Sequence, residues 1–207
     1  MRLAHEEQYN NDADASVTDE FAEEAIRSLE TAVERDPQDH ESLFYLGYIH
    51  LFMRDNWERA APYLERAYDL DPKDPEYLIG MGWVHSQNAE ESLEDAQTAV
   101  TYYEESIEIS PMPLAYNGLG HVLSNGINDQ IRAIESLEQA IELDPSYVSP
   151  YHNLALAHAR LGEKEKALEY YEGVYELTGE NDTRRDELRE ELLAIDTINI
   201  QDDELAQ

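Results

Sequence analysis

A motif that recurs about every 34 residues constrains the fold of this chain more than any other feature. Each of five copies begins with Ala, carries Leu or Tyr four residues later, and has Ala, Ser or Val three residues beyond that. The copies end at Pro37, Pro72, Pro111, Pro145 and Gly179, at intervals of 35, 39, 34 and 34 residues. Such periods are typical of helical hairpins that each bury an apolar face against the next hairpin. The sequence therefore predicts an all-α repeat array.

A second apolar pattern precedes four of the five copies, so that each of these units contains two predicted helices. In the second unit, Leu43, Leu46 and Gly47 define the first helix, and Ala60 and Leu64 belong to the second. Small residues at Gly47 and Ala60 allow the two helix backbones to approach closely. Each unit is thus predicted to be a helix-turn-helix hairpin.

These residues resemble the tetratricopeptide repeat. Two units fit the family pattern in full, with Leu43, Leu46, Gly47, Ala60, Leu64, Ala67 and Pro72 in one and Tyr116, Leu119, Gly120, Ala133, Leu137, Ala140 and Pro145 in the other. The resemblance implies an α-solenoid, a right-handed superhelix of about four to five helix-turn-helix units. It also implies a concave groove lined by the first helices, which in this family typically binds peptides or partner proteins.

The predicted organisation has four parts. Residues 1–17 are polar and unpatterned and are predicted to be disordered. The repeat array is predicted over 18–179, followed by a capping helix over 180–195 and an acidic, disordered tail over 196–207. A terminal helix with one narrow apolar stripe is what an array needs to cover its last repeat.

The resemblance also assigns residues to the groove. Mapping the groove-facing positions onto this sequence gives a set that runs from aromatic at one end to polar and His-bearing at the other. They are Phe44, Tyr48 and Phe52 in the second unit, Ile79, Trp83 and Gln87 in the third, Asn117, His121 and Asn125 in the fourth, and His152, Leu156 and Arg160 in the fifth.

One subfamily clamps the terminal carboxylate of heat-shock chaperones with Lys, Asn and Arg in the groove. This chain has only three lysines, none of which maps to the groove, and only Asn117, Asn153 and Arg160 lie near suitable positions. The sequence therefore predicts no such clamp.

A formal net charge of −33 limits the partners that the chain can bind. Nucleic acids and anionic membrane surfaces require clustered Lys and Arg, so both are excluded as predicted partners. Acidic residues at Glu41 and Glu76 border the aromatic part of the predicted groove and favour an apolar peptide with basic flanks. Self-association stays open, because the ends of repeat arrays can stack.

The sequence offers no chemistry of its own. It contains no cysteine, no nucleotide-binding loop, no nucleophile elbow and no zinc-binding helix motif, so we expect neither cofactor, metal nor enzymatic activity. No secretory or membrane-spanning pattern is present, which favours a cytoplasmic location. Two functions remain: a scaffold that binds a peptide in its groove, and a non-catalytic subunit of an enzyme or secretion assembly bound through its convex face or its ends.

Many carboxylates with few lysines resemble the composition of proteins from salt-loving organisms. If self-repulsion between these carboxylates destabilises the fold, added salt stabilises it by screening. We expect the melting temperature to rise between about 0.1 and 1 M salt, where the Debye length falls from about 10 to about 3 Å. A melting temperature that does not rise with salt would contradict this hypothesis.

Overall fold

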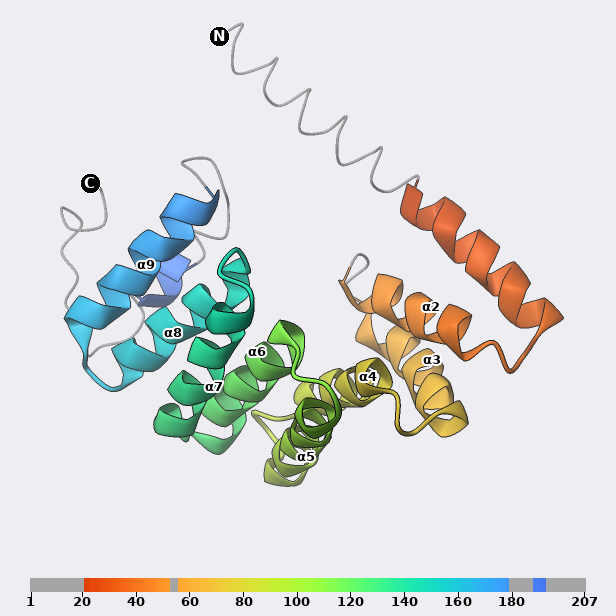
Figure 1. Ribbon diagram of the computed structural model, residues 1–207, viewed down its shortest axis with the longest axis horizontal. Coiled ribbons are helices and arrows are strands. Elements are labelled where there is room, and N and C mark those ends of the chain that lie inside the picture. Colours follow the sequence, from red (N-terminus) through yellow and green to blue (C-terminus); the bar gives the residue numbers. More distant parts are fainter. Residues whose placement is uncertain (1–20, 53–55, 179–187, 193–207) are drawn as a thin grey trace, which may run out of the picture. The chain divides into compact units, whose positions relative to one another are not determined.

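A computed structural model describes residues 21–52, 56–178 and 188–192, and all regular structure in these ranges is helical (Figure 1). The all-α prediction is therefore confirmed. The predicted disordered segment 1–17 and the predicted tail 196–207 lie outside the described residues. Residues 21–35 and 188–192 are helical, and between them lie α2 (His40–Phe52), α3 (Trp57–Leu70), α4 (Pro75–Ser86), α5 (Leu93–Ile109), α6 (Pro113–Val122), the π-helix η1 (Leu123–Ile127), α7 (Gln130–Leu143), α8 (Val148–Arg160) and α9 (Lys164–Thr178).

The chain divides into two compact units, Met1–Val84 and His85–Gln207. Their boundary falls near the end of α4, within the third repeat. Each unit consists of helices packed against their neighbours in sequence, as the α-solenoid class requires. The right-handed superhelix, which spans both units, stays a prediction.

In the first unit, the helical segment 21–35 covers one side of the α2–α3 hairpin. Ala22 and Ile26 form a buried cluster with Leu46 and Ile49 of α2. The side chain of Asn56 accepts a hydrogen bond from the backbone N–H of Arg59 at 3.0 Å and caps α3. Such a cap satisfies one of the N–H groups that a helix start leaves without a partner.

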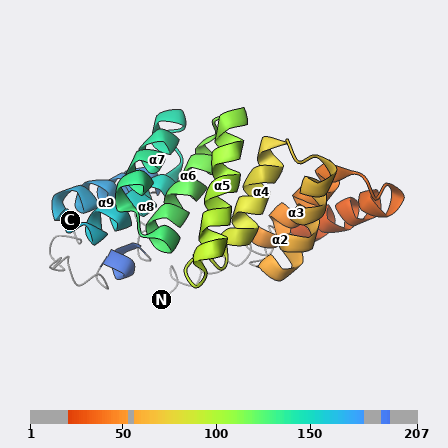
Figure 2. The same cartoon turned by 90° about the horizontal axis from the view of Figure 1, so that it is seen from below.

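In the second unit, α5 to α9 lie side by side in chain order (Figure 2). Ser92 caps α5 and Asp129 caps α7. Each side chain accepts a hydrogen bond from the backbone N–H of the residue three positions later. The described part of the predicted capping helix, 188–192, places Leu188 and Leu192 in the core, fully buried against α8 and α9. Leu188 and Leu192 thus pack on the last repeat, and a capping helix over 180–195 stays a prediction.

Close approach of paired helices explains the glycine in two of the hairpins. A Cβ atom on Gly47 would lie 2.5 Å from Cγ of Leu64, and one on Gly120 would lie 2.5 Å from Cγ of Leu137. Both distances are shorter than real Cβ contacts allow. Glycine is therefore required at the equivalent position of both hairpins because the partner leucine fills the space.

Between α6 and α7 the sequence contains Asn125-Gly126, a dipeptide that is typical of a turn. Both residues belong to η1, and the chain instead reverses at Asn128, which adopts the left-handed conformation with φ 61°. A Cβ on Gly126 would lie 2.9 Å from the carbonyl oxygen of Ala89 and 2.9 Å from Cβ of Ala96. The glycine is thus needed for contact with the preceding hairpin, and not for a turn.

Replacing Gly47 by Ala tests the close packing of α2 on α3. We expect Gly47→Ala to lower the free energy of unfolding by about 1–3 kcal/mol, the usual cost of overpacking a core. Gly80→Ala is the matched control, because its Cβ would meet its nearest atom at 3.2 Å. Both variants gain about 1 kcal/mol in helix propensity, and this gain offsets only the milder contact at Gly80. Chemical denaturation followed by circular dichroism measures both, and an equal loss for the two variants would contradict the packing argument.

Candidate functional site

Five aromatic side chains of the first unit form one contact cluster, which we call the aromatic cluster. Phe44, Tyr48 and Phe52 are four residues apart on α2 and therefore share a helix face. Tyr77 and Trp83 of α4 meet that face. The ring centroids lie 4.6 Å apart for Phe52 and Trp83, 5.9 Å for Tyr48 and Trp83, and 5.2 Å for Phe44 and Tyr77. Four of these rings, those of Phe44, Tyr48, Phe52 and Trp83, are residues that the sequence assigned to the groove, whereas Tyr77 is not; the groove itself stays a prediction.

The cluster has a buried layer and an exposed layer. Phe44 and Trp83 are only 6% and 8% exposed, whereas Tyr48 and Phe52 are 39% and 50% exposed. The two exposed rings also contact each other, with centroids 4.8 Å apart. Tyr48 and Phe52 therefore offer accessible aromatic surface, and Phe44 and Trp83 support it from below.

Carboxylates surround the base of the aromatic cluster. The Tyr77 hydroxyl lies 2.7 Å from Nδ1 of His40. Burial, followed by the negative charges of Asp74, Glu41 and Glu76, raises the pKa of Tyr77 to about 12. Burial contributes most to this shift, and the carboxylates add to it because a phenol is harder to ionise beside negative charge.

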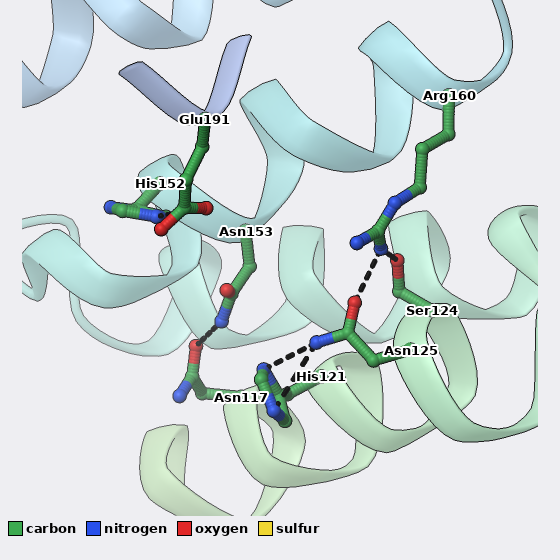
Figure 3. Close-up of polar contacts among 8 residues, drawn as sticks. All are labelled: Asn117, His121, Ser124, Asn125, His152, Asn153, Arg160 and Glu191. Carbon is green, nitrogen blue, oxygen red and sulfur yellow. Dashed lines mark hydrogen bonds and ion pairs between the residues drawn. The ribbon is translucent and has the colours of Figure 1, made fainter. Parts of the chain in front are cut away.

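In the second unit, six polar side chains form the polar cluster, drawn in Figure 3. Its members come from α6, η1 and α8 and are Asn117, His121, Ser124, Asn125, Asn153 and Arg160.

Hydrogen bonds connect these members across the helices. Nδ2 of Asn153 donates to Oδ1 of Asn117 at 3.0 Å, and Nδ2 of Asn125 lies 3.1 Å from Nδ1 and 3.2 Å from Nε2 of His121. NH1 of Arg160 donates to Oγ of Ser124 at 2.6 Å and to Oδ1 of Asn125. These bonds form two groups, Asn153 with Asn117 and Arg160 with Ser124, Asn125 and His121, and Asn153 lies within hydrogen-bonding reach of His121.

A pocket of about 340 Å³ borders the polar cluster. Its lining residues are Asn117, Val148, Ser149, His152 and Asn153. Nε2 of His152 lies 3.4 Å from a carboxylate oxygen of Glu191, which the helical segment 188–192 supplies (Figure 3). The capping segment thus contributes a charged group beside residues that the sequence assigned to the groove.

His121 is both accessible and desolvated. Its side chain is exposed by surface area, yet desolvation by the surrounding protein lowers its pKa, with Arg160 and His152 acting in the same direction. Glu90 and a hydrogen bond with Asn153 oppose this shift. A ring that water reaches although protein atoms surround it lies in a concave part of the surface.

The remaining predicted groove residues differ in accessibility. Ile79 and Leu156 are buried, and Leu156 belongs to the core cluster that contains Leu188 and Leu192. Gln87 is exposed in the turn that follows α4. Ile79 and Leu156 thus offer little surface to a ligand.

Three histidines occupy equivalent positions near the ends of α2, α4 and α8, and they connect paired helices. His50 stacks on Tyr63 and His85 stacks on Tyr102. His158 stacks on Tyr170 with ring centroids 5.4 Å apart, and its Nδ1 lies 2.8 Å from Glu163. Each ring contacts the second helix of its own hairpin, as expected for histidines that stabilise the array.

Comparison with known families agrees with this architecture. Sequence models described as tetratricopeptide repeat match residues 13–75 and 148–181, and one described as TPR repeat matches residues 128–162. Together these ranges cover more than half of the chain.

The chain belongs to the tetratricopeptide repeat family. Proteins of this family bind other proteins or peptides and are generally non-catalytic scaffolds. The coarse function of a protein-interaction scaffold follows from this membership.

Among curated proteins, the chain is similar to small glutamine-rich tetratricopeptide repeat-containing protein 2 of Saccharomyces cerevisiae (strain ATCC 204508 / S288c), with 32% identity over 89 residues. The match covers 43% of this chain and spans 26% of the length of that relative.

Two solved structures share the fold at low sequence identity. TTC0263, a thermophilic TPR protein of Thermus thermophilus, has a TM-score of 0.71 and 18% identity, covering 83% of this chain and 91% of its own. PilW, a type IV pilus biogenesis factor, has a TM-score of 0.69 and 15% identity, covering 87% of this chain and 85% of its own. At these identities the likeness shows the tetratricopeptide solenoid fold alone.

Within the described ranges, no helix combines the length and the apolar character needed to cross a bilayer.

The two layers of the aromatic cluster respond differently to truncation. We expect Trp83→Ala to lower the free energy of unfolding by about 3–5 kcal/mol, as for a buried aromatic ring. Phe52→Ala removes a half-exposed ring and is expected to cost about 1 kcal/mol. Thermal and chemical denaturation measure both variants. Equal losses would mean that Phe52 belongs to the core and offers no free surface.

Proposed function

We propose that this chain binds a peptide segment of a partner protein through the first-helix faces of its repeats. The aromatic cluster of the first unit binds apolar side chains, and the polar cluster of the second unit binds polar groups of a ligand. The exposed pair of Tyr48 and Phe52, resting on buried Trp83, is the single observation that carries the proposal. No catalytic step is part of it.

The arrangement of the rings favours a binding role because the exposed rings are already fixed in place. Tyr48 and Phe52 each contact Trp83, at centroid distances of 5.9 and 4.6 Å. Aromatic side chains held rigidly at a surface lose little conformational entropy when a partner binds, and they are enriched among residues that dominate binding energy. The interface would therefore depend chiefly on these two rings.

The charge around the cluster favours basic residues in the ligand. Glu41, Asp74 and Glu76 each act on the Tyr77 hydroxyl, so they lie close to the aromatic surface. Complementary charge steers association and suppresses partners with acidic flanks. An apolar segment flanked by Arg or Lys is the ligand class that this surface fits.

The competing function is that of a non-catalytic subunit in a larger assembly, bound through the second helices. Leu93 on α5 and Ile131 on α7 are 60% and 59% exposed, and both lie at the start of a second helix. Exposed single apolar residues are common on protein surfaces, so the aromatic cluster remains the stronger candidate.

A labelled peptide with a Leu-Phe centre and Arg flanks tests the proposal by fluorescence anisotropy. We expect Phe52→Ala to weaken its binding at least about tenfold, as for a residue that dominates an interface. Leu93→Ala is the matched control, since it removes an exposed apolar side chain from a second helix. Equal affinity for the native chain and Phe52→Ala, or a loss with Leu93→Ala instead, would favour the competing function.

The same assay tests the charge argument. Against the Arg-flanked peptide, the double variant Glu41→Gln and Glu76→Gln should bind less tightly, by about two- to tenfold at low salt. Against a peptide with Ser flanks, the variant should bind as the native chain does. A variant that loses affinity for both peptides to the same extent would show that the carboxylates do not select the flanks.

A further inference from the structure

We propose that the polar cluster binds ligand only while His121 is neutral, so that protonation of this single ring switches the second unit from a binding to a non-binding state. This regulation rests on the proposed function of the same face. It follows from the direction in which each hydrogen bond of the cluster must run.

Arg160 fixes the direction at one end of the network. A guanidinium has N–H donors and no acceptor, so the Asn125 atom that faces it must be the amide oxygen. The Asn125 amide nitrogen then faces His121, at 3.1 Å from Nδ1 and 3.2 Å from Nε2. The two distances are nearly equal, so this nitrogen lies over the ring and not in line with either ring lone pair. An amide N–H over the face of an aromatic ring is a favourable contact only while that ring is neutral.

A hydrogen bond to the Ser124 hydroxyl holds the Arg160 guanidinium in place beside Asn125. Its oxygen accepts from Arg160 at 2.6 Å and its proton is donated to Oε1 of Gln130 at 2.7 Å. Gln130 in turn donates to the carbonyl oxygen of Ser124 at 3.0 Å, and both residues are buried. The guanidinium is therefore held by a buried pair and cannot easily turn away from Asn125.

At the other end of the cluster, the hydrogen bonds run in the same direction and include two residues that line the pocket. Asn153 lies within hydrogen-bonding reach of His121, and its amide nitrogen donates to Asn117 at 3.0 Å. Nδ2 of Asn117 donates to the Tyr147 hydroxyl at 3.3 Å. Each asparagine amide thus accepts a hydrogen bond from the neighbour that is nearer to Arg160 and donates one to the neighbour that is nearer to Tyr147. His121 stands between Asn125 and Asn153 in this order.

Protonation of His121 breaks this order. An imidazolium is positively charged, so its face no longer attracts the Asn125 amide N–H group and repels it. Rotating the Asn125 amide would bring its oxygen to the ring but would turn its nitrogen toward Arg160, where two donors would meet. No orientation of Asn125 satisfies both neighbours, and the contact between α6 and α8 must rearrange.

The rearrangement reaches the ligand site because two members of the network line the pocket. Asn117 and Asn153 belong both to the chain of hydrogen bonds and to the pocket of about 340 Å³. A ligand that uses their amide groups would lose these partners when His121 is charged.

The charged groups around His121 favour the neutral ring. Arg160 and His152 of α8 repel a proton on it, and Glu90, between α4 and α5, attracts one. A carboxylate oxygen of Glu191 lies 3.4 Å from Nε2 of His152, which is itself one of these groups. Desolvation outweighs the two contributions that raise the pKa of His121, so the net shift is downward.

Nuclear magnetic resonance tests the mechanism without any ligand. Above its pKa the ring of His121 is neutral, and lowering the pH below that value charges it. We expect the side-chain amide signals of Asn125 and Asn153 to shift along the titration curve of His121, and the midpoint to lie below the ordinary histidine value of about 6.5. A midpoint at or above that value, or amide signals that ignore the titration, would overturn the mechanism whatever the ligand is.

His121→Gln separates the switch from other effects of acid. Its amide can accept from Asn125 at one atom and donate to Asn153 at the other, whatever the pH. In this variant the Asn125 and Asn153 signals should stay constant between about pH 7.5 and pH 5. His152→Gln is the matched control, and its signals should shift as in the native chain. A dependence that is lost in His152→Gln and kept in His121→Gln would overturn the assignment.

A binding measurement connects the mechanism to function. Peptides selected from a random library at about pH 7.5, and displaced by Asn153→Ala, serve as the probe. Their affinity should fall about tenfold or more by pH 5 in the native chain, which corresponds to about 1.4 kcal/mol, and should stay constant in His121→Gln. Equal pH dependence in both proteins would overturn the switch. If no such peptide is found, the proposed function of this face fails, and the resonance titration alone decides the mechanism.

Discussion

In two of the hairpins, the contact between a leucine on the second helix and a glycine on the first determines how closely the paired helices pack. Leu64 fills the space above Gly47, and Leu137 fills the equivalent space above Gly120, so that α2 meets α3 and α6 meets α7 at close range. Because these contacts fix the spacing within each hairpin, they also fix which face of each first helix stays uncovered. The aromatic and polar clusters lie on first helices and therefore depend on this packing.

Both clusters combine a buried support with an accessible surface. In the first unit, Trp83 is buried beneath Tyr48 and Phe52. In the second unit, the buried Ser124 holds Arg160, which holds Asn125. Such supports hold the accessible groups in one conformation before a partner arrives, which lowers the entropic cost of binding.

Much of this arrangement could be predicted from the sequence, because the repeat period and the helix periodicity report local geometry. The spacing of Phe44, Tyr48 and Phe52 is enough to place three rings on one helix face. This spacing does not predict which of the rings is buried, because their burial depends on Trp83, which belongs to another helix. The hydrogen bond between Ser124 and Arg160 could not be predicted either. The π-helical turn at the end of α6 changes which residues share a face, compared with a regular helix. The dipeptide Asn125-Gly126, considered alone, predicts a turn. The structure gives a different reason for the glycine, which is its close contact with Ala89 and Ala96.

The claim that first helices form the binding surface can be tested by mapping chemical-shift changes on the chain as the Arg-flanked peptide is added. We expect the largest changes on the side chains of Tyr48 and Phe52 and on neighbouring residues of α2 and α4. Changes that are largest on the second helices, around Leu93 or Ile131, would contradict it.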